Sequence, residues 1–251
     1  ESVIDKLPKI RSVLNRKFIR SEFVEGKKKR FYKNLQDNDE LWENYVNVFK
    51  KEIISWNGLT KYNNKQTIVA PKTGIGAEFV EACNTINNNH PLSKWYLDNK
   101  LKGVPNHQSR SHLVEDLMRY LFAGIFTLSE GRFPRMNDYE KHNEDLLPDH
   151  KSARTGKFAD RFRVQVPNDP ATTVTSHISK DGHYFIHYDP NQCRSLTVRE
   201  AARIQTFPDN YLFCGSRTAQ FHQVGNAVPP YLAKQIAEIV KKIIDKNGHR
   251  L

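Results

Sequence analysis

Three cysteines and two closely spaced histidines are the side chains of this sequence that could act as nucleophiles, form disulfides or bind a metal. Cys83, Cys193 and Cys214 are far apart and form no Cys-x-x-Cys pair, which argues against a disulfide framework and is typical of a reducing cytoplasm. His183 and His187 are four residues apart, but no second ligand pair is present to complete a zinc site. We therefore predict no metal site and interpret both histidines as polar residues on the surface of a strand.

Several other classes of function are excluded or unsupported. No Pro-Asp pair is followed by Glu-x-Lys, and no order of Ser, His and Asp can be assigned, so a nuclease or another hydrolase lacks support. No run of about 18 apolar residues is present, which excludes a transmembrane helix. Residues 1–10 lack the apolar region of a secretory signal.

Positive charge is concentrated at the beginning of the chain. The net charge is +11, from 39 Lys and Arg against 28 Asp and Glu. Residues 1–34 contain eleven of these cations and four acids, a net charge of +7, together with four large aromatic side chains. Such a stretch suits contact with a nucleic-acid backbone, because neutralised phosphates release counterions. The alternative is a mobile basic arm that keeps the protein soluble.

Two amphipathic helices are predicted in the first half of the chain. In residues 37–56 the apolar side chains recur every three or four positions and so share one face: Leu41, Trp42, Tyr45, Phe49 and Ile53. In residues 109–128 a wider apolar stripe precedes Gly131, a favoured stop signal. Residues 57–106 are polar and contain three prolines, so we expect loops with short elements there.

A β-hairpin is predicted in the second half. Residues 161–166, 172–178 and 183–188 alternate between apolar and polar side chains, which favours strands. Asp181-Gly182 lies between the second and third of these segments and is a strong hairpin turn signal.

Two further helices complete the predicted elements. Thr197 and Glu200 are spaced as a capping box and predict a helix over 198–206. Pro229 is a good first residue for the last helix. Its apolar stripe is predicted to be buried and consists of Leu232, Ile236, Ile239, Val240, Ile243 and Ile244, while Lys241, Lys242 and Lys246 suit its C-terminal dipole.

The most specific signature lies near the end of the chain. Residues 194–209 read RSLTVREAARIQTFPD, and after thirteen residues 223–233 read QVGNAVPPYLA. These segments resemble the two closing motifs of the DNA cytosine-5 methyltransferases, and residues 170–190 resemble the end of that family's target-recognition domain. The resemblance covers about residues 155–245, and residues 109–147 resemble one bacterial branch of the family.

The resemblance implies an α+β fold divided into three parts. Residues 1–34 would be a basic N-terminal connecting segment, and residues 35–192 a target-recognition domain with helices and a small β-sheet. Residues 193–251 would carry the closing motifs, with the last helix returning to an α/β methyltransferase domain. Arg194, Arg199 and Arg203 would brace the two domains rather than touch bases, and Gln205, Phe207 and Pro208 would be architectural.

The resemblance also implies binding residues, each with a plainer alternative. Asn226, Ala227 and Val228 would line a pocket for S-adenosylmethionine, with Gly225-Asn226 making a turn; an ordinary Asn-capped helix start is the alternative. Double-stranded DNA would be the partner of the recognition region, although Thr is also a favoured strand residue. The residues assigned to DNA are Lys151, Arg154, Lys157, Arg161, Arg163, Thr172, Thr173, Thr175 and Lys180.

Other family motifs are absent from the sequence. The Pro-Cys-Gln nucleophile, the Glu-Asn-Val and Gln-x-Arg-x-Arg motifs and the Phe-x-Gly-x-Gly cofactor loop do not occur. We therefore predict no catalytic residue here and an N-terminal catalytic half on a separate chain or elsewhere in the same polypeptide. Glu rather than Met at position 1 favours a fragment.

Two functions follow from this combination. The first is the DNA-recognition and cofactor-closing part of an enzyme that methylates carbon 5 of a flipped cytosine, located in the bacterial cytoplasm at the nucleoid. The alternative is a non-catalytic, sequence-specific DNA-binding module that retains the methyltransferase tail. In the first case one face of the last helix would be exposed in the isolated chain, and we expect poor solubility.

Overall fold

The computed structural model describes residues 2–56, 59, 62, 66–148, 161–180 and 182–247, and its fold is α+β with small sheets. The first elements form a hairpin rather than a mobile arm. Strand β1 (Val13–Val24) pairs antiparallel with β2 (Lys27–Asn34), and β5 (Ser111–Leu113) adds to the other edge of β1 in parallel. Before the hairpin, Ile4, Leu7 and Ile10 are buried in the body of the protein.

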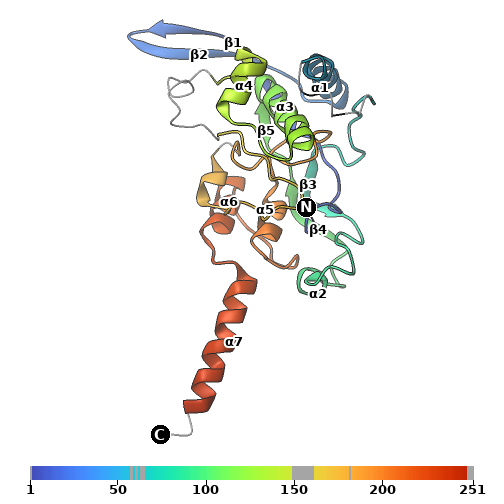
Figure 1. Ribbon diagram of the computed structural model, residues 1–251, viewed down its shortest axis with the longest axis vertical. Helices are drawn as coiled ribbons and strands as arrows, with labels where there is room; N and C mark the ends of the chain where they lie inside the picture. Colours follow the sequence, from blue (N-terminus) through green and yellow to red (C-terminus); the bar gives the residue numbers. More distant parts are fainter. Residues whose placement is uncertain are drawn as a thin grey trace.

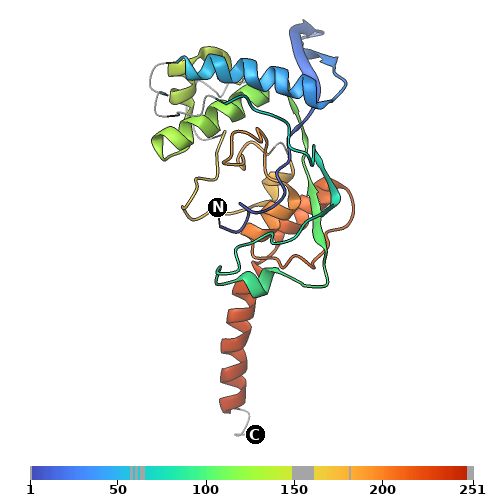
Figure 2. The ribbon, with the colours of Figure 1, turned by 90° about the vertical axis from the view of Figure 1, so that its right-hand side faces the viewer.

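A helical lobe lies beside this sheet and contains one of two hydrophobic clusters. Helix α1 (Asp39–Ile54) packs on α3 (Val114–Glu130), and α4 (Met136–His142) and the 3₁₀ turn η1 (Glu144–Leu146) cover α3 (Figures 1 and 2). The predicted helix over 37–56 is confirmed. The helix predicted from 109 begins later because residues 111–113 pair with β1, and it ends at Gly131, whose φ of 69° satisfies a left-handed cap.

The second cluster lies around the closing motifs. Strands β3 (Gly76–Glu81) and β4 (Gly103–Gln108) form an antiparallel pair, connected through the short helix α2 (Ser93–Tyr96). Helix α5 (Val198–Ile204) packs on β4, and α6 (Arg217–Asn226) packs on the 3₁₀ turn η3 (Ser176–Ser179). The capping box of Thr197 and Glu200 is confirmed, with each side chain accepting from the other residue's N–H.

The strands predicted in residues 161–188 are wrong. In the described part of this segment, ladder pairing is limited to single bridges from Ile186 to Val164 and to Ser195. In residues 183–187 the side chains of His183, Phe185, Ile186 and His187 are all buried, so this stretch has no solvated strand face. The segment instead fills the space between the two clusters, and Asp181 of the predicted turn lies outside the described residues.

Helix α7 (Pro230–Asn247) extends away from the rest of the molecule, at the opposite end from the β1–β2 hairpin (Figures 1 and 2). Its apolar stripe, predicted to be buried, is exposed in this chain. The six side chains, Leu232, Ile236, Ile239, Val240, Ile243 and Ile244, are between 47% and 62% exposed. This agrees with the exposed face expected for the isolated chain. No helix within the described ranges has the length and apolar character needed to cross a membrane.

Candidate functional site

Three arginines of the first closing motif form a buried polar core around α5. Arg194, Arg199 and Arg203 are at most 1% exposed. Arg194 makes two hydrogen bonds of 2.7 Å to the Glu200 carboxylate, and Arg203 bonds both oxygens of Asp209 at 2.9 and 2.5 Å. Carboxylates or backbone carbonyls of the protein accept from each of the three guanidinium groups.

The bracing contacts join segments that are distant in the sequence. Arg203 donates to the carbonyls of Val3 and Thr85, and Arg199 donates to the carbonyls of Pro105, Pro208 and Tyr211. Burial lowers the pKa of Arg199 to about 10, although the Asp209 carboxylate favours its charged form. Burial by itself raises the pKa of Glu200, but the Arg194 guanidinium overcomes this effect and holds it below its usual range.

The two closing motifs meet residues 172–175, the threonine segment, at one contact. The Gln205 amide donates to the carbonyl of Val174 at 3.2 Å and to that of Val224 at 3.4 Å. Gly225 lies against the same segment: a Cβ there would be 2.4 Å from the Thr175 carbonyl carbon and from the Ser176 nitrogen. Only glycine permits this approach of α6 to η3, and the predicted Gly225-Asn226 turn is in fact the end of α6.

Four of the residues assigned to DNA line one cavity of about 280 Å³: Arg163, Thr172, Thr173 and Thr175, together with His177, Tyr184 and Phe185. Thr172 is held internally, since its N–H and hydroxyl donate to Gln165 Oε1 at 3.2 and 3.1 Å. Thr173 and Thr175 are exposed. The cavity therefore offers accessible hydroxyls beside a guanidinium and two aromatic rings.

The other residues assigned to DNA do not share this cavity. Arg161 lines a cavity of about 220 Å³ with Arg30 and Tyr32 of β2. Lys180 lines one of about 180 Å³ with Arg16 of β1 and with Arg110. Lys151, Arg154 and Lys157 lie outside the described residues.

Asn226, Ala227 and Val228 occupy the link between α6 and α7. Asn226 is exposed, Ala227 is half-buried, and Val228 is 63% exposed. A carboxamide beside an exposed apolar side chain fits one wall of a site for a ligand with polar and apolar parts. Helix α7 begins at Pro230, and its Tyr231 N–H is already capped by Thr206 Oγ1 at 3.1 Å, so the helix N-terminus is partly satisfied by the protein.

The histidines form buried contacts that the sequence analysis missed. His187 and His183, interpreted as strand-surface residues, are at most 8% exposed; that interpretation is wrong because the segment lies between the two clusters. The Tyr120 hydroxyl lies 2.7 Å from His183 Nδ1, and His107 Nδ1 lies 3.1 Å from Thr197 Oγ1. Burial lowers the pKa of His107 and that of His187 to about 4, so both rings are neutral near pH 7. The described residues contain no cluster of three metal-ligating side chains.

The three thiols of the chain lie in different environments. Cys193 is buried, its thiol donates to the Leu117 carbonyl, and burial raises its pKa above the usual range. A thiol in this state is a poor nucleophile. Cys83 and Cys214 are exposed and lie outside any Pro-Cys-Gln sequence.

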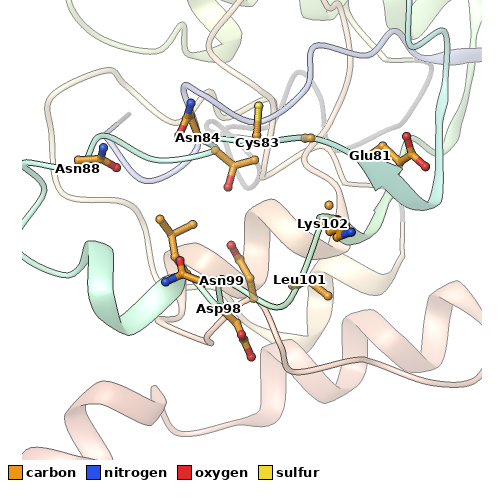
Figure 3. Close-up of a pocket in the computed structure, with 13 residues that line it drawn as sticks. Glu81, Cys83, Asn84, Asn88, Asp98, Asn99, Leu101 and Lys102 are labelled. Atoms are coloured by element: carbon orange, nitrogen blue, oxygen red, sulfur yellow. The ribbon is translucent and has the colours of Figure 1, made fainter.

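A cavity of about 750 Å³ lies between the loop that follows β3 and the loop that follows α2 (Figure 3). Three carboxylates, Glu81, Asp98 and Asp209, line it with a single ammonium group, Lys102. Asp98 accepts from the Lys100 N–H and the Asn210 amide, and Asp209 is paired with Arg203. The acidic lining disfavours a phosphate ligand, and none of the predicted binding residues reaches this cavity.

Comparison with known proteins identifies relatives among the type II methyltransferases. A curated methyltransferase of Bacillus paralicheniformis, Type II methyltransferase M.Bpa9945I, is 41% identical over 206 residues, 80% of this chain and 44% of that protein. A putative type II methyltransferase of Oceanobacillus iheyensis, M.OihORF3336P, is 42% identical over 58% of this chain and 30% of that protein. The chain thus spans less than half the length of these two relatives.

A third relative is covered over most of its own length. Type II methyltransferase M.AquIB of a Picosynechococcus species is 42% identical over 102 residues, which are 36% of this chain but 70% of that protein. The family model described as C-5 cytosine-specific DNA methylase matches residues 5–242. On this evidence the chain belongs to the C-5 cytosine-specific DNA methylase family.

Proposed function

We propose that this chain is the DNA-recognition and cofactor-closing part of a DNA cytosine-5 methyltransferase, which methylates carbon 5 of a flipped cytosine with S-adenosylmethionine. The observation that carries the proposal is the contact made by Gly225 and Gln205. Through it the threonine segment, proposed for DNA, and the end of α6, proposed for the cofactor, belong to one packed unit.

The cavity lined by Arg163, Thr173 and Thr175 supports the DNA part of the proposal. A flipped base costs a few kcal/mol in lost stacking and pairing, which contacts to the flanking backbone offset. Exposed hydroxyls and a guanidinium are suited to phosphate oxygens, and such contacts position the duplex. Lys180 and Arg161 extend the proposed surface, each in its own cavity.

The link 226–228 supports the cofactor part. S-adenosylmethionine supplies the methyl group when bound. Asn226 would hydrogen-bond its polar part, and Val228 would cover an apolar part, which together make one wall of the site. The remaining walls and the nucleophilic thiol would come from a catalytic half that these 251 residues do not include.

The exposed face of α7 supports such a partner. Six large aliphatic side chains on one helix are about half exposed, a contiguous apolar surface of the kind that marks an interaction site. The helix extends away from the body of the chain, which leaves that face open to a docking domain (Figures 1 and 2). In bacteria like those of the compared relatives, the proposed reaction would take place on DNA at the nucleoid.

Reconstitution tests the proposal. The chain is mixed with a catalytic half that carries the Pro-Cys-Gln motif and the cofactor loop, and transfer of a labelled methyl group to duplex DNA is measured. We expect transfer in the mixture and none from this chain alone. Asn226→Ala should raise the KM for S-adenosylmethionine, whereas His222→Ala, an exposed residue one turn earlier on α6, should not.

The alternative function predicts a different outcome. Specific DNA binding by the chain, without methyl transfer in any mixture with a catalytic half, would support a non-catalytic DNA-binding module. Methyl transfer by the chain alone would contradict the proposed division of the site between two halves.

A further inference from the structure

The β1–β2 hairpin is a finger that projects from the body of the molecule, at the end opposite to α7 (Figures 1 and 2). Its strands pair in register from Arg20–Phe31 to Val24–Lys27, and a bulge lies between Phe18 and Arg20. Glu25 and Gly26 have φ values of 51° and 74°. Two consecutive positive φ angles characterise the type I′ turn, whose twist matches that of the strands, so the tip is regular rather than frayed.

The base of the finger is fixed to the helical lobe. Leu14 is buried in the lobe's hydrophobic cluster, and the Phe18 N–H donates to the Glu115 carboxylate of α3 at 3.2 Å. Phe18 packs edge-on against Tyr32, with ring centroids 6.0 Å apart. Because β1 also pairs with β5, the outer half of the hairpin is held in a defined direction.

The outer half carries an excess of positive charge. The whole hairpin, residues 13–34, contains eight Lys and Arg against two acids, a net charge of +6 out of +11 for the chain. Lys27, Lys28, Lys29 and Arg30 are consecutive and all exposed. Since successive strand residues point to opposite faces, both faces of the finger present cations. Exposed cations contribute little to stability, even where they contact a neighbouring side chain as Lys29 does over the Phe31 ring.

The finger also adjoins the surface proposed for DNA. Arg30 and Tyr32 line the same cavity as Arg161, and Arg16 lines the same cavity as Lys180. The hairpin cations therefore continue outward from residues already assigned to the duplex. Phe23, near the tip, is 77% exposed and adds an apolar side chain that the fold does not use.

We infer that the β1–β2 hairpin is a second DNA-contact element, which binds the phosphate backbone of the duplex beyond the cavity that contains the threonines. This inference rests on the proposed function, because it takes DNA as the partner. It assigns the affinity of the chain for DNA mainly to Lys27, Lys28, Lys29 and Arg30. The choice of target sequence is left to the cavity lined by Arg163, Thr173 and Thr175, the recognition cavity.

The experiment compares two triple variants of the full chain that lose the same charge. K27Q/K28Q/K29Q neutralises the finger, and K241Q/K242Q/K246Q neutralises three exposed lysines of α7. Binding to a duplex of random sequence is measured over a range of salt concentrations. For the finger variant we expect the slope of log affinity against log salt to fall by about 2 to 3, and affinity to fall by roughly a hundredfold at low salt. The α7 variant should lose less than about threefold.

The outcomes separate this inference from the proposed function. Equal losses in both variants, or no loss in the finger variant, would overturn the inference. If Arg163→Gln still weakened binding in that case, the proposed recognition cavity would stand. Failure of the unmodified chain to bind any duplex would overturn both. Tighter binding to phosphatidylserine vesicles than to the duplex, lost in the finger variant, would assign the finger to a membrane and also overturn the inference. An unchanged melting temperature shows that the finger variant is folded.

Discussion

Cationic side chains are used in opposite ways in two regions of this molecule. Around α5, Arg194, Arg199 and Arg203 are buried, and carboxylates or backbone carbonyls accept from each guanidinium. At the outer end of the β1–β2 hairpin, four consecutive cations are exposed to solvent. One region has its positive charge neutralised by the fold, and the other carries its positive charge at the surface.

The difference follows from the cost of desolvation. Removing a guanidinium from water costs several kcal/mol, so a buried arginine persists only with a full set of acceptors, and the loss of one partner leaves an uncompensated charge. An exposed cation keeps its hydration and contributes about 0–1 kcal/mol to stability. We therefore expect substitutions in the first region to change folding and substitutions in the second to change binding.

The largest expected effect is on stability, from Arg203→Met. This change removes the pair with Asp209 and leaves that carboxylate buried without its guanidinium. We expect the free energy of unfolding to fall by about 3–5 kcal/mol, measured by urea denaturation. The double variant R203M/D209N should be less destabilised than R203M, and Lys29→Gln should change stability by less than about 0.5 kcal/mol. Comparable losses of unfolding free energy from Arg203→Met and Lys29→Gln would contradict the distinction between buried and exposed cations.

The buried region should also respond to pH, whereas the hairpin should not. His107 and His187 have folded pKa values of about 4, below the usual value, because burial disfavours the charged ring. The unfolded chain therefore binds protons that the folded chain cannot. Stability should be complete above about pH 6.5 and fall as the pH drops toward 4, by about 2 kcal/mol per histidine between pH 7 and pH 5.

A variant isolates this titration. His107→Gln should flatten the dependence of the melting temperature on pH over this range, whatever its effect on absolute stability. The hairpin variant K27Q/K28Q/K29Q should leave the slope unchanged. An identical slope in the His107→Gln variant and the parent would show that His107 is not part of the pH response.

A smaller effect is expected where the two predicted sites meet. Gly225→Ala places a methyl group 2.4 Å from backbone atoms of Thr175 and Ser176, so α6 and η3 must separate. We expect a loss of about 1–3 kcal/mol in stability and weaker binding to DNA together, measured by denaturation and by duplex titration. Gln223→Ala, at an exposed position on the same helix, is the control. Loss of stability with full DNA binding would separate the threonine segment from the proposed site.

The smallest effect on the folded chain is expected on α7. Ile236→Lys with Ile243→Lys replaces side chains that are 50% and 54% exposed, so stability should change by less than about 0.5 kcal/mol. The same variant should be more soluble and should fail to restore methyl transfer with the catalytic half. Lys242→Gln should restore it normally. Full transfer by the isoleucine variant would exclude this face as the docking surface.

Local signals in the sequence predicted a substantial part of the fold. The stripe of Trp42 and its neighbours predicts α1, and the Thr197–Glu200 spacing predicts the start of α5. Ser216, which caps α6 by accepting from the Ala219 N–H, is a local signal for a helix that is not among the predicted elements. These features depend on contacts within about one helical turn, so a short stretch of sequence is enough to specify them.

The predicted strands in residues 161–188 failed for a related reason. Alternation predicts a strand when one face meets water, but in residues 183–187 side chains on both faces are covered by other parts of the chain. The same covering buries His183 and His187. Burial from outside a segment leaves no periodic trace within it, so the pattern suggested solvent-exposed histidines. In residues 172–178 the exposed Thr173 and Thr175 flank the buried Val174, yet this described stretch forms no ladder pair.

The sequence by itself determined the family, through two motifs whose order and spacing are specific, and it determined the helices whose caps and apolar stripes are local. Only the tertiary structure decided which cations are buried, how closely Gly225 approaches Thr175, and that the basic start of the chain is an anchored hairpin. Arg203 bonds the carbonyl of Val3 across 200 positions of the sequence. Such contacts depend on how distant segments pack, and this packing determines whether a charge is neutralised inside the protein or exposed at its surface.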